Sequence, residues 1–151
     1  MKDVDRSAFL SDLRQAAAKE GKEVFIFIHG FNTTFAVGLR QTAQLKTDLS
    51  FHGPALMYSW PSDGRVPAFT ADVNLSLTTV QHLEQFLQET AATPSITGSH
   101  ILAHSLGSRP LLFALYDLRK NAFVSNKIKN VILAAPEIVS AGVCRRVVRR
   151  N

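Results

Sequence analysis

The sequence has few of the features that mark membrane, secreted or nucleotide-binding proteins. Its longest apolar runs, such as residues 24–28, are far too short to span a bilayer. The charged N-terminus has no apolar segment behind it, so no secretory signal is predicted. The single cysteine, Cys144, excludes an intrachain disulfide and fits a reducing compartment. Neither a Gly-x-Gly-x-x-Gly nor a Walker A motif is present. We therefore expect a cytoplasmic protein with no membrane span.

What is present indicates an ordinary globular chain with an uneven charge distribution. The 151 residues are 46% hydrophobic and 19% charged, which fits one domain with a modest core. The net charge of +5 comes from the C-terminal part, where residues 144–150 contain four arginines. Such a run is typical of a solvated helix turn or of a surface that binds nucleic acid. We favour the first interpretation and expect no nucleic-acid partner.

Strand and helix patterns alternate along the chain. Apolar runs at residues 24–28, 55–60, 100–104 and 131–135 predict strands. Helical spacing is found over residues 3–19, about 35–49, from about 73 to before Pro94, and from 106 to about 120. This alternation predicts an α/β fold, a three-layer α/β/α sandwich with a mostly parallel sheet and strand order 2-1-3-4. No linker or repeat divides the chain, so we predict a single domain over residues 1–151.

The most distinctive stretch surrounds Ser105. The strand at 100–104 runs straight into this serine, and a helical pattern begins directly after it. A serine on a sharp strand-to-helix turn is typical of a nucleophile elbow, where the residues two before and two after must be small. Here they are Ala103 and Gly107. The alternative is a serine that caps an ordinary helix. Pro110 is expected to remove a hydrogen bond near the start of the helix and to kink it.

The expected sheet brings a second loop beside this serine. In the order 2-1-3-4, the loops after the first and third strands meet at the switch point, where ligands bind in open α/β sheets. Acyl transfer by a serine needs two N–H donors for the carbonyl oxygen as it gains charge. One would be the N–H of Leu106, and the other that of Phe31, where Gly30 lets the backbone turn. We expect His29 and Asn32 to hold this loop by side-chain hydrogen bonds.

Four motifs resemble those of the α/β-hydrolase superfamily and, within it, the alpha/beta hydrolases of unknown function (DUF900). They are FIHGFNTTF at 27–35, YSWPS at 58–62, LAHSLG at 102–107 and NVILAAP at 130–136. The resemblance implies an esterase-like serine hydrolase acting on carboxylic esters or thioesters, with Ser105 as the nucleophile and with no cofactor and no metal. Relatives continue into strands that carry an acid and a histidine, so the sequence resembles a family member truncated at both ends.

The sequence departs from a complete catalytic triad. Triads on this fold run serine, acid, histidine in chain order, but no histidine follows Ser105. The neighbouring His104 is expected to point to the opposite face of its strand. Glu137, just past the fourth strand, is a conceivable acid. Since a serine without its base is a weak nucleophile, we predict little or no turnover by this chain alone.

Two other functions stay open. The fold could serve as a non-catalytic binding or oligomerisation domain, because an exposed edge at the fourth strand invites pairing with a second copy. A flavodoxin-like domain would instead hold an anionic ligand at residues 106–108, where a helix begins.

Overall fold

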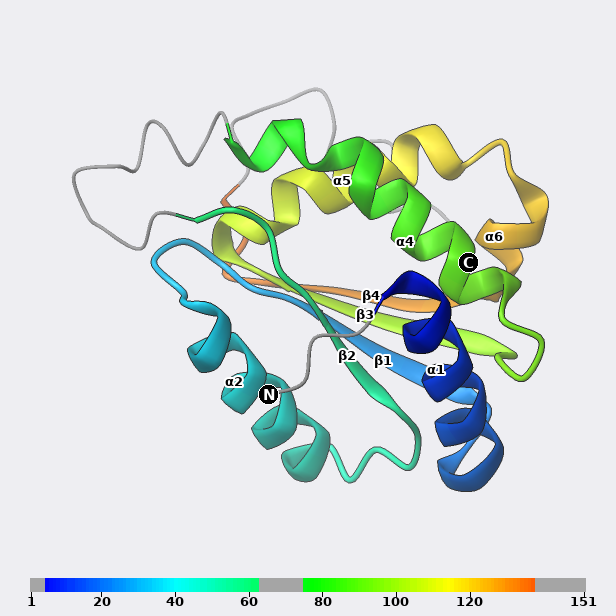
Figure 1. The fold of residues 1–151 in the computed structure, drawn as a ribbon. Helices are drawn as coiled ribbons and strands as arrows, with labels where there is room; N and C mark the ends of the chain where they lie inside the picture. Colours follow the sequence, from blue (N-terminus) through cyan, green and yellow to red (C-terminus); the bar gives the residue numbers. More distant parts are fainter. Residues whose placement is uncertain (1–4, 63–74, 138–151) are drawn as a thin grey trace.

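The computed structural model describes residues 5–62 and 75–137. Its centre is a sheet of four parallel strands, β1 (Glu23–Ile28), β2 (Ala55–Tyr58), β3 (Gly98–His104) and β4 (Ile128–Ala134). The strands lie in the order β2-β1-β3-β4, which confirms the predicted order. Helices cover both faces of this sheet, so the predicted three-layer α/β/α sandwich is also confirmed (Figure 1). The expected helix starts near Asp3 and Val73 and the basic run at 144–150 lie outside the described residues.

The helices follow the predicted spacing with one addition. They are α1 (Arg6–Glu20), α2 (Phe35–Asp48), α4 (Val80–Ala92), α5 (Ser108–Leu118) and α6 (Ala122–Lys127). Helix α6 was not predicted, because six residues are too few to show a helical period. A local hydrogen bond marks its start: the Asn121 side chain accepts from the N–H of Val124 at 3.3 Å, as N-cap residues do.

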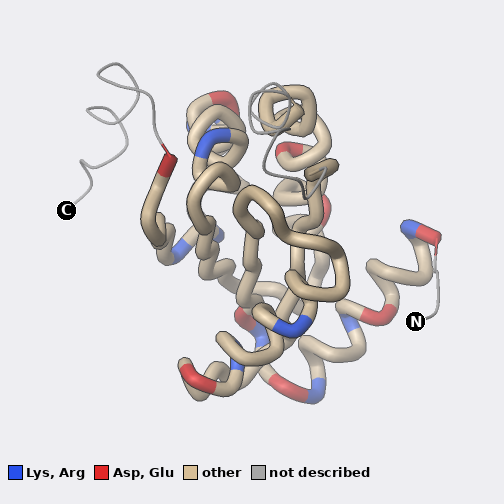
Figure 2. Tube along the Cα trace, turned by 90° about the vertical axis from the view of Figure 1, so that its left-hand side faces the viewer, with Lys and Arg blue, Asp and Glu red and all other residues tan. Residues whose placement is uncertain are grey.

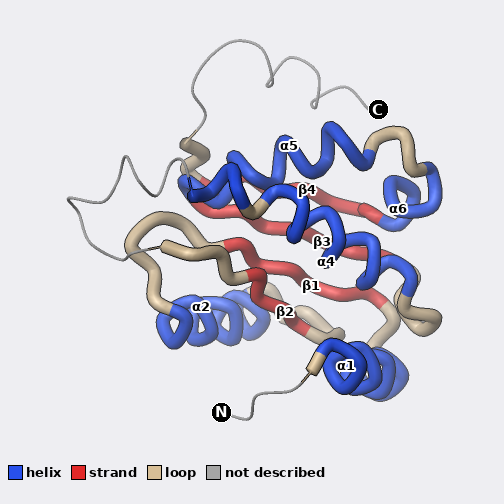
Figure 3. Tube along the Cα trace, turned by 45° about the horizontal axis from the view of Figure 1, so that its top comes forward, coloured by secondary structure: helices blue, strands red, loops and turns tan. Residues whose placement is uncertain are grey.

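The two central strands are buried on both faces. On one face, Val24, Ile26, Ile28 and Ile101 pack in the larger core, to which α1, α4 and α5 contribute. On the other face, Phe25, Phe27 and Leu102 form a smaller core under α2. Figure 3 shows α2 on one side of the strands and α4 and α5 on the other. Because alternate side chains point to opposite faces, a continuous apolar run fits a strand covered on both sides.

Strand β4 is an edge of the sheet and is much less covered than β1 and β3. Its Val131 and Ile132 side chains are 36% and 47% exposed. Acidic and basic residues are interspersed over the described surface rather than gathered by sign (Figure 2). Within the described ranges, none of the helices combines the length and the apolar character needed to cross a bilayer.

Glu84 on α4 and Asp117 on α5 form a carboxyl pair. Burial raises the pKa of Glu84, and the charge and hydrogen bond of Asp117 raise it further. A raised pKa means that the folded state binds this proton more tightly, so the stabilisation is present at low pH and is lost as pH rises through the folded pKa. We expect Glu84→Gln to increase the melting temperature at pH 7 by about 1–2 °C and to leave it unchanged near pH 3. A variant that melts below the wild type at pH 7 would contradict this reading.

Candidate functional site

The structure places Ser105 on a strained turn between strand and helix. Strand β3 ends at His104, and the short 3₁₀ helix η2 (Ser105–Gly107) then leads directly into α5. The φ angle of Ser105 is +48°, in the left-handed region. A non-glycine residue there costs about 1–2 kcal/mol, and it persists only where the surrounding structure enforces it. An ordinary serine N-cap has an extended backbone, so this geometry favours the elbow over the simple cap.

Two glycines let the loops after β1 and β3 approach each other. A Cβ added at Gly107 would lie 2.4 Å from the carbonyl oxygen of His29, at the end of β1. A Cβ added at Gly30 would lie 3.0 Å from the Cβ of Ser105 and 3.0 Å from the carbonyl oxygen of His104. Neither position has room for a side chain. The two loops therefore meet at the carboxyl ends of the strands, as the switch-point argument predicted.

His29 holds the first of these loops in place. It is fully buried, and its Nδ1 lies 2.9 Å from the carbonyl oxygen of Gly30. Its Nε2 accepts the N–H of Trp60 at 3.3 Å and lies 3.2 Å from the Oγ of Ser59. The N–H of Trp60 can only donate, so Nε2 carries no proton and Nδ1 is the donor to Gly30. These side-chain hydrogen bonds are of the kind predicted for His29, whose part in shaping a functional site stays a prediction.

Trp60 completes this anchor in a way that the sequence did not reveal. Its indole Nε1 donates to the carbonyl oxygen of His29 at 2.8 Å, and its ring stacks on the imidazole with centroids 5.4 Å apart. Only 2% of Trp60 is exposed. The YSWPS motif thus packs the end of β2 against the loop after β1. The side-chain hydrogen bond expected of Asn32 is not formed among the described residues: its side chain is exposed, and its backbone has a φ of +55°, a conformation that asparagine tolerates well.

Phe31 and Leu106, the residues expected to supply the two N–H donors, lie in the two loops that meet at Ser105. Phe31 is half-buried and packs against the larger core, whereas Leu106 is fully buried. Leu106 is the second residue of η2, next to the serine. The convergence of the two amides on one substrate oxygen stays a prediction.

The helix that follows the elbow tolerates its proline. Pro110 is the third residue of α5, and the helix continues to Leu118. In the first turn of a helix an N–H has no partner within the helix, so proline is well tolerated there. The expected loss of a hydrogen bond and the kink at Pro110 stay predictions.

A third loop reaches the elbow from β4. The backbone N–H of Glu137 donates to the carbonyl oxygen of Ser105 at 3.2 Å. Ala135 takes a left-handed backbone, φ +45°, and Pro136 follows it, so the chain turns sharply after the strand. Glu137, the conceivable acid, is thus hydrogen-bonded through its backbone to Ser105, the predicted nucleophile.

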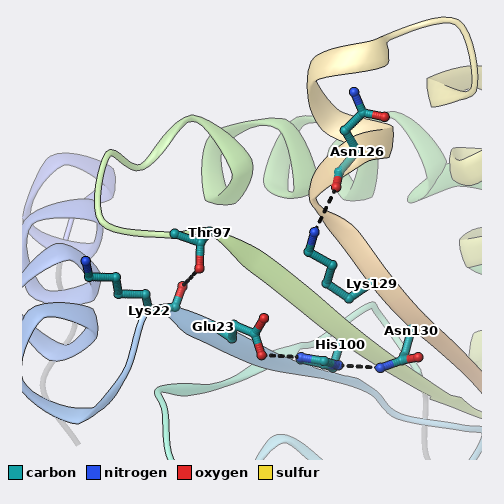
Figure 4. Close-up of polar contacts among 7 residues, drawn as sticks. All are labelled: Lys22, Glu23, Thr97, His100, Asn126, Lys129 and Asn130. Atoms are coloured by element: carbon teal, nitrogen blue, oxygen red, sulfur yellow. Dashed lines mark hydrogen bonds and ion pairs between the residues drawn. The ribbon is translucent and has the colours of Figure 1, made fainter.

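The five histidines divide into those at this end of the sheet and those elsewhere. His52 lies between α2 and β2, and His82 is an exposed residue of α4. His100 lies four residues before the end of β3, about 13 Å from His104 along the strand. Figure 4 shows it bonded to two neighbours: Glu23 at 2.9 Å from Nε2 and Asn130 at 2.8 Å from Nδ1. Only His29 and His104 lie at the Ser105 end of the sheet.

Three cavities lined by described residues lie away from this site. One, of about 440 Å³, lies between α1, α2 and the edge of β2, with apolar walls that include Phe9, Leu39 and Met57. Its lining includes none of the residues in the loops that meet at Ser105. In the same described part of the chain, His, Cys, Asp and Glu side chains form no group of three that would suit a metal ion.

Comparison with protein families agrees with this geometry. The model of the family described as "Alpha/beta hydrolase of unknown function (DUF900)" matches residues 5–149. The match includes all four strands, the loop after β1 and the Ser105 turn. Searches of curated proteins and of solved structures found no match. Since the family model covers nearly the whole sequence, the chain belongs to the DUF900 family of alpha/beta hydrolases.

Proposed function

We propose that this chain is a serine hydrolase of esterase type, acting on carboxylic esters or thioesters through Ser105. The observation that carries the proposal is the left-handed backbone of Ser105 at the end of β3, beside Gly30 and Gly107. A fold that retains a strained serine and two glycines without room for a side chain maintains a costly local geometry. Such strain is characteristic of functional sites. The single cysteine supports a cytoplasmic location, and the proposed chemistry needs no cofactor.

The proposed reaction begins with attack of the Ser105 Oγ on the carbonyl carbon of the ester. The carbonyl oxygen gains negative charge, which the N–H groups of Phe31 and Leu106 would stabilise. Each such donor is typically worth about 2.7–4 kcal/mol in the transition state. The N-terminal end of η2 and α5 adds a favourable dipole, because the positive end of a helix faces the developing anion.

Glu137 is the acid that this proposal favours. The bond from its N–H to the carbonyl oxygen of Ser105 supports this choice, because it holds the residue next to the elbow. Asp117, the other described carboxylate after Ser105, lies near the end of α5 and is hydrogen-bonded to Glu84. No histidine follows in the sequence to relay a proton between acid and serine. We therefore propose weak turnover for this chain.

Fluorophosphonate labelling tests the nucleophile. We expect the wild-type protein to be labelled covalently, since only an activated serine reacts quickly. Ser105→Ala should remove the label, measured by intact-protein mass spectrometry. The control is Ser125→Ala on α6, which should be labelled like the wild type. Equal labelling of the Ser105 variant and the wild type would refute the proposed function. Brisk hydrolysis of p-nitrophenyl acetate that depends on Ser105 would show instead that the site has an efficient base.

A second candidate function is supported by the edge strand. The exposed Val131 and Ile132 side chains on β4 favour a non-catalytic domain that pairs with a second copy. This function would leave Ser105 unlabelled and would give a dimer in light scattering. A strictly monomeric protein would count against it.

A further inference from the structure

The free edge of β2 opens into the cavity of about 440 Å³ between α1 and α2. Its lining includes the four consecutive residues 54–57. Side chains alternate between the two faces of a strand, so a cavity on one face would be lined by every second residue only. Residues 55–57 are half-exposed, whereas their partners on β1, residues 25–27, are buried. The cavity therefore lies along the edge of the sheet and not on either face.

Two residues of this edge carry backbone groups that have no neighbouring strand. The N–H of Phe25 donates to the carbonyl oxygen of Pro54 at 3.0 Å, so the carbonyl group of Pro54 points toward β1. Successive residues of a parallel ladder point their backbone groups to alternate sides. The N–H and C=O groups of Ala55 and Met57 consequently point away from β1, toward the cavity. Within the described residues β1 is the only strand that pairs with β2.

Both walls of the cavity are apolar, and they belong to helices on opposite faces of the sheet. Phe9 and Leu13 of α1 form one wall, and Leu39 and Ala43 of α2 form the other. Helix α1 contributes to the larger core and α2 covers the smaller one. Figure 3 shows both helices at the β2 side of the sheet. A further strand beside β2 would thus be covered on both faces, as β1 is.

Charge and shape limit what can occupy this edge. Lys46 and Glu20 neutralise each other, with Nζ 2.6 Å from Oε2. The remaining charged side chain of the lining is Asp12, which is exposed and makes no ion pair or hydrogen bond with another described residue. Its carboxylate favours a basic partner. The β2 edge of a second copy is excluded, because the helices that flank both strands would meet before the strands could pair.

We propose that the β2 edge binds an extended segment of a partner protein, which adds to the sheet as a fifth strand. The segment bonds to the backbone of Ala55 and Met57 and points small apolar side chains alternately toward α1 and α2. A lysine or arginine beside them contacts Asp12. About four residues match the length of β2, at about 3.3 Å for each residue. The cavity is separate from the Ser105 loops, so this inference does not depend on the proposed function.

A synthetic peptide tests the proposal on the full chain. The probe is the fluorescein-labelled peptide lysine-valine-alanine-valine-alanine-lysine, and its binding is measured by fluorescence anisotropy. We expect it to bind and to slow hydrogen exchange at the amides of Ala55 and Met57, which it would cover. The same peptide with its four central nitrogens methylated keeps the apolar side chains but cannot donate to the strand, so its binding should be lost. A peptide with glutamate in place of both lysines should bind more weakly.

Two substitutions test the protein side of the contact. Ala55→Pro removes an N–H that β1 does not use, at the first residue of an edge strand, where proline is tolerated. It should weaken peptide binding by about 5- to 10-fold, the effect of one hydrogen bond. Asp12→Asn should weaken it about threefold at low salt. The control is Asp48→Asn on α2, outside the cavity lining, which should bind like the wild type.

The outcomes decide between strand addition and other uses of the cavity. Loss of binding on methylation, together with weaker binding by the Ala55 variant, would support the proposal. Equal binding of the methylated peptide would overturn it, because the cavity would then bind apolar side chains alone. Absence of binding by the unmethylated peptide would also overturn it, as would self-association of the wild type that Ala55→Pro abolishes. If thermal unfolding shows that Ala55→Pro does not fold, the methylated peptide and Asp12→Asn still decide.

Discussion

Gly107→Ala is expected to destabilise the protein by about 3 kcal/mol, more than most surface or loop substitutions would. The added Cβ would lie 2.4 Å from the carbonyl oxygen of His29 and 3.0 Å from that of Ile28. Both are backbone atoms at the end of a central strand, so they cannot move aside as a flexible side chain would. Either β1 or the start of α5 must shift, and the elbow shifts with it. Urea unfolding would measure the loss of stability.

Gly38→Ala provides the matched control for this substitution. Gly38 is a buried residue of α2, and a Cβ there would meet the Sδ of Met57 at 2.5 Å. That atom belongs to a flexible side chain, and alanine gains about 1 kcal/mol of helix propensity over glycine. We expect Gly38→Ala to be at least as stable as the wild type, within about 0.5 kcal/mol. Equal losses of stability in both variants would contradict this account, because they would show that the contact of the new Cβ with the carbonyl oxygen of His29 is not what destabilises Gly107→Ala.

His29→Ala is expected to cost about 2–4 kcal/mol of stability and also to slow the labelling of Ser105. The substitution leaves a cavity against Trp60 and removes the acceptor of the buried Trp60 N–H. It also releases the carbonyl oxygen of Gly30 from Nδ1. Of the bonds between this loop and the end of β2, only that from the Trp60 indole to the backbone carbonyl oxygen of residue 29 would then remain. The two measurements are urea unfolding and the rate of fluorophosphonate labelling.

His82→Ala is the control, because His82 is exposed on α4 and alanine suits a helix. It should change neither stability nor labelling. A His29→Ala protein that unfolds like the His82 variant but is no longer labelled would contradict the anchoring part assigned to His29. That result would make His29 a direct participant in the chemistry.

The α/β architecture could be predicted from the sequence because the same local patterns repeat along it. Each apolar run followed by helical spacing predicts a strand and its return helix, and right-handed crossovers limit the possible orders. The start of β4 was missed: Lys129 and Asn130 interrupt the apolar pattern, since an edge strand exposes these positions to solvent. Because this edge is open to solvent, no pattern of buried side chains marks the three residues from Ile128 to Asn130 as part of the strand.

The site was predictable where it depends on neighbours in sequence and not where it depends on distant contacts. The Ser105 turn and the small residue Gly107 follow from the strand-to-helix pattern. The bond between Glu137 and Ser105 joins backbone groups 32 positions apart, and no local pattern encodes it. The approach of the His104 Nδ1 to Gly30 is similar, because it depends on how closely two loops pack.

The central claim is that residue 105 is held in a left-handed backbone at the end of β3, and the stabilities of Ser105→Gly and Ser105→Ala test it most directly. Neither variant has a nucleophile, so they differ only in the backbone preference of the new residue. Glycine adopts a φ of +48° without strain, whereas alanine does not. The account predicts that the glycine variant is more stable in urea by about 1 kcal/mol. At a regular helix or strand position alanine would be more stable by a similar amount, and that result would contradict the account.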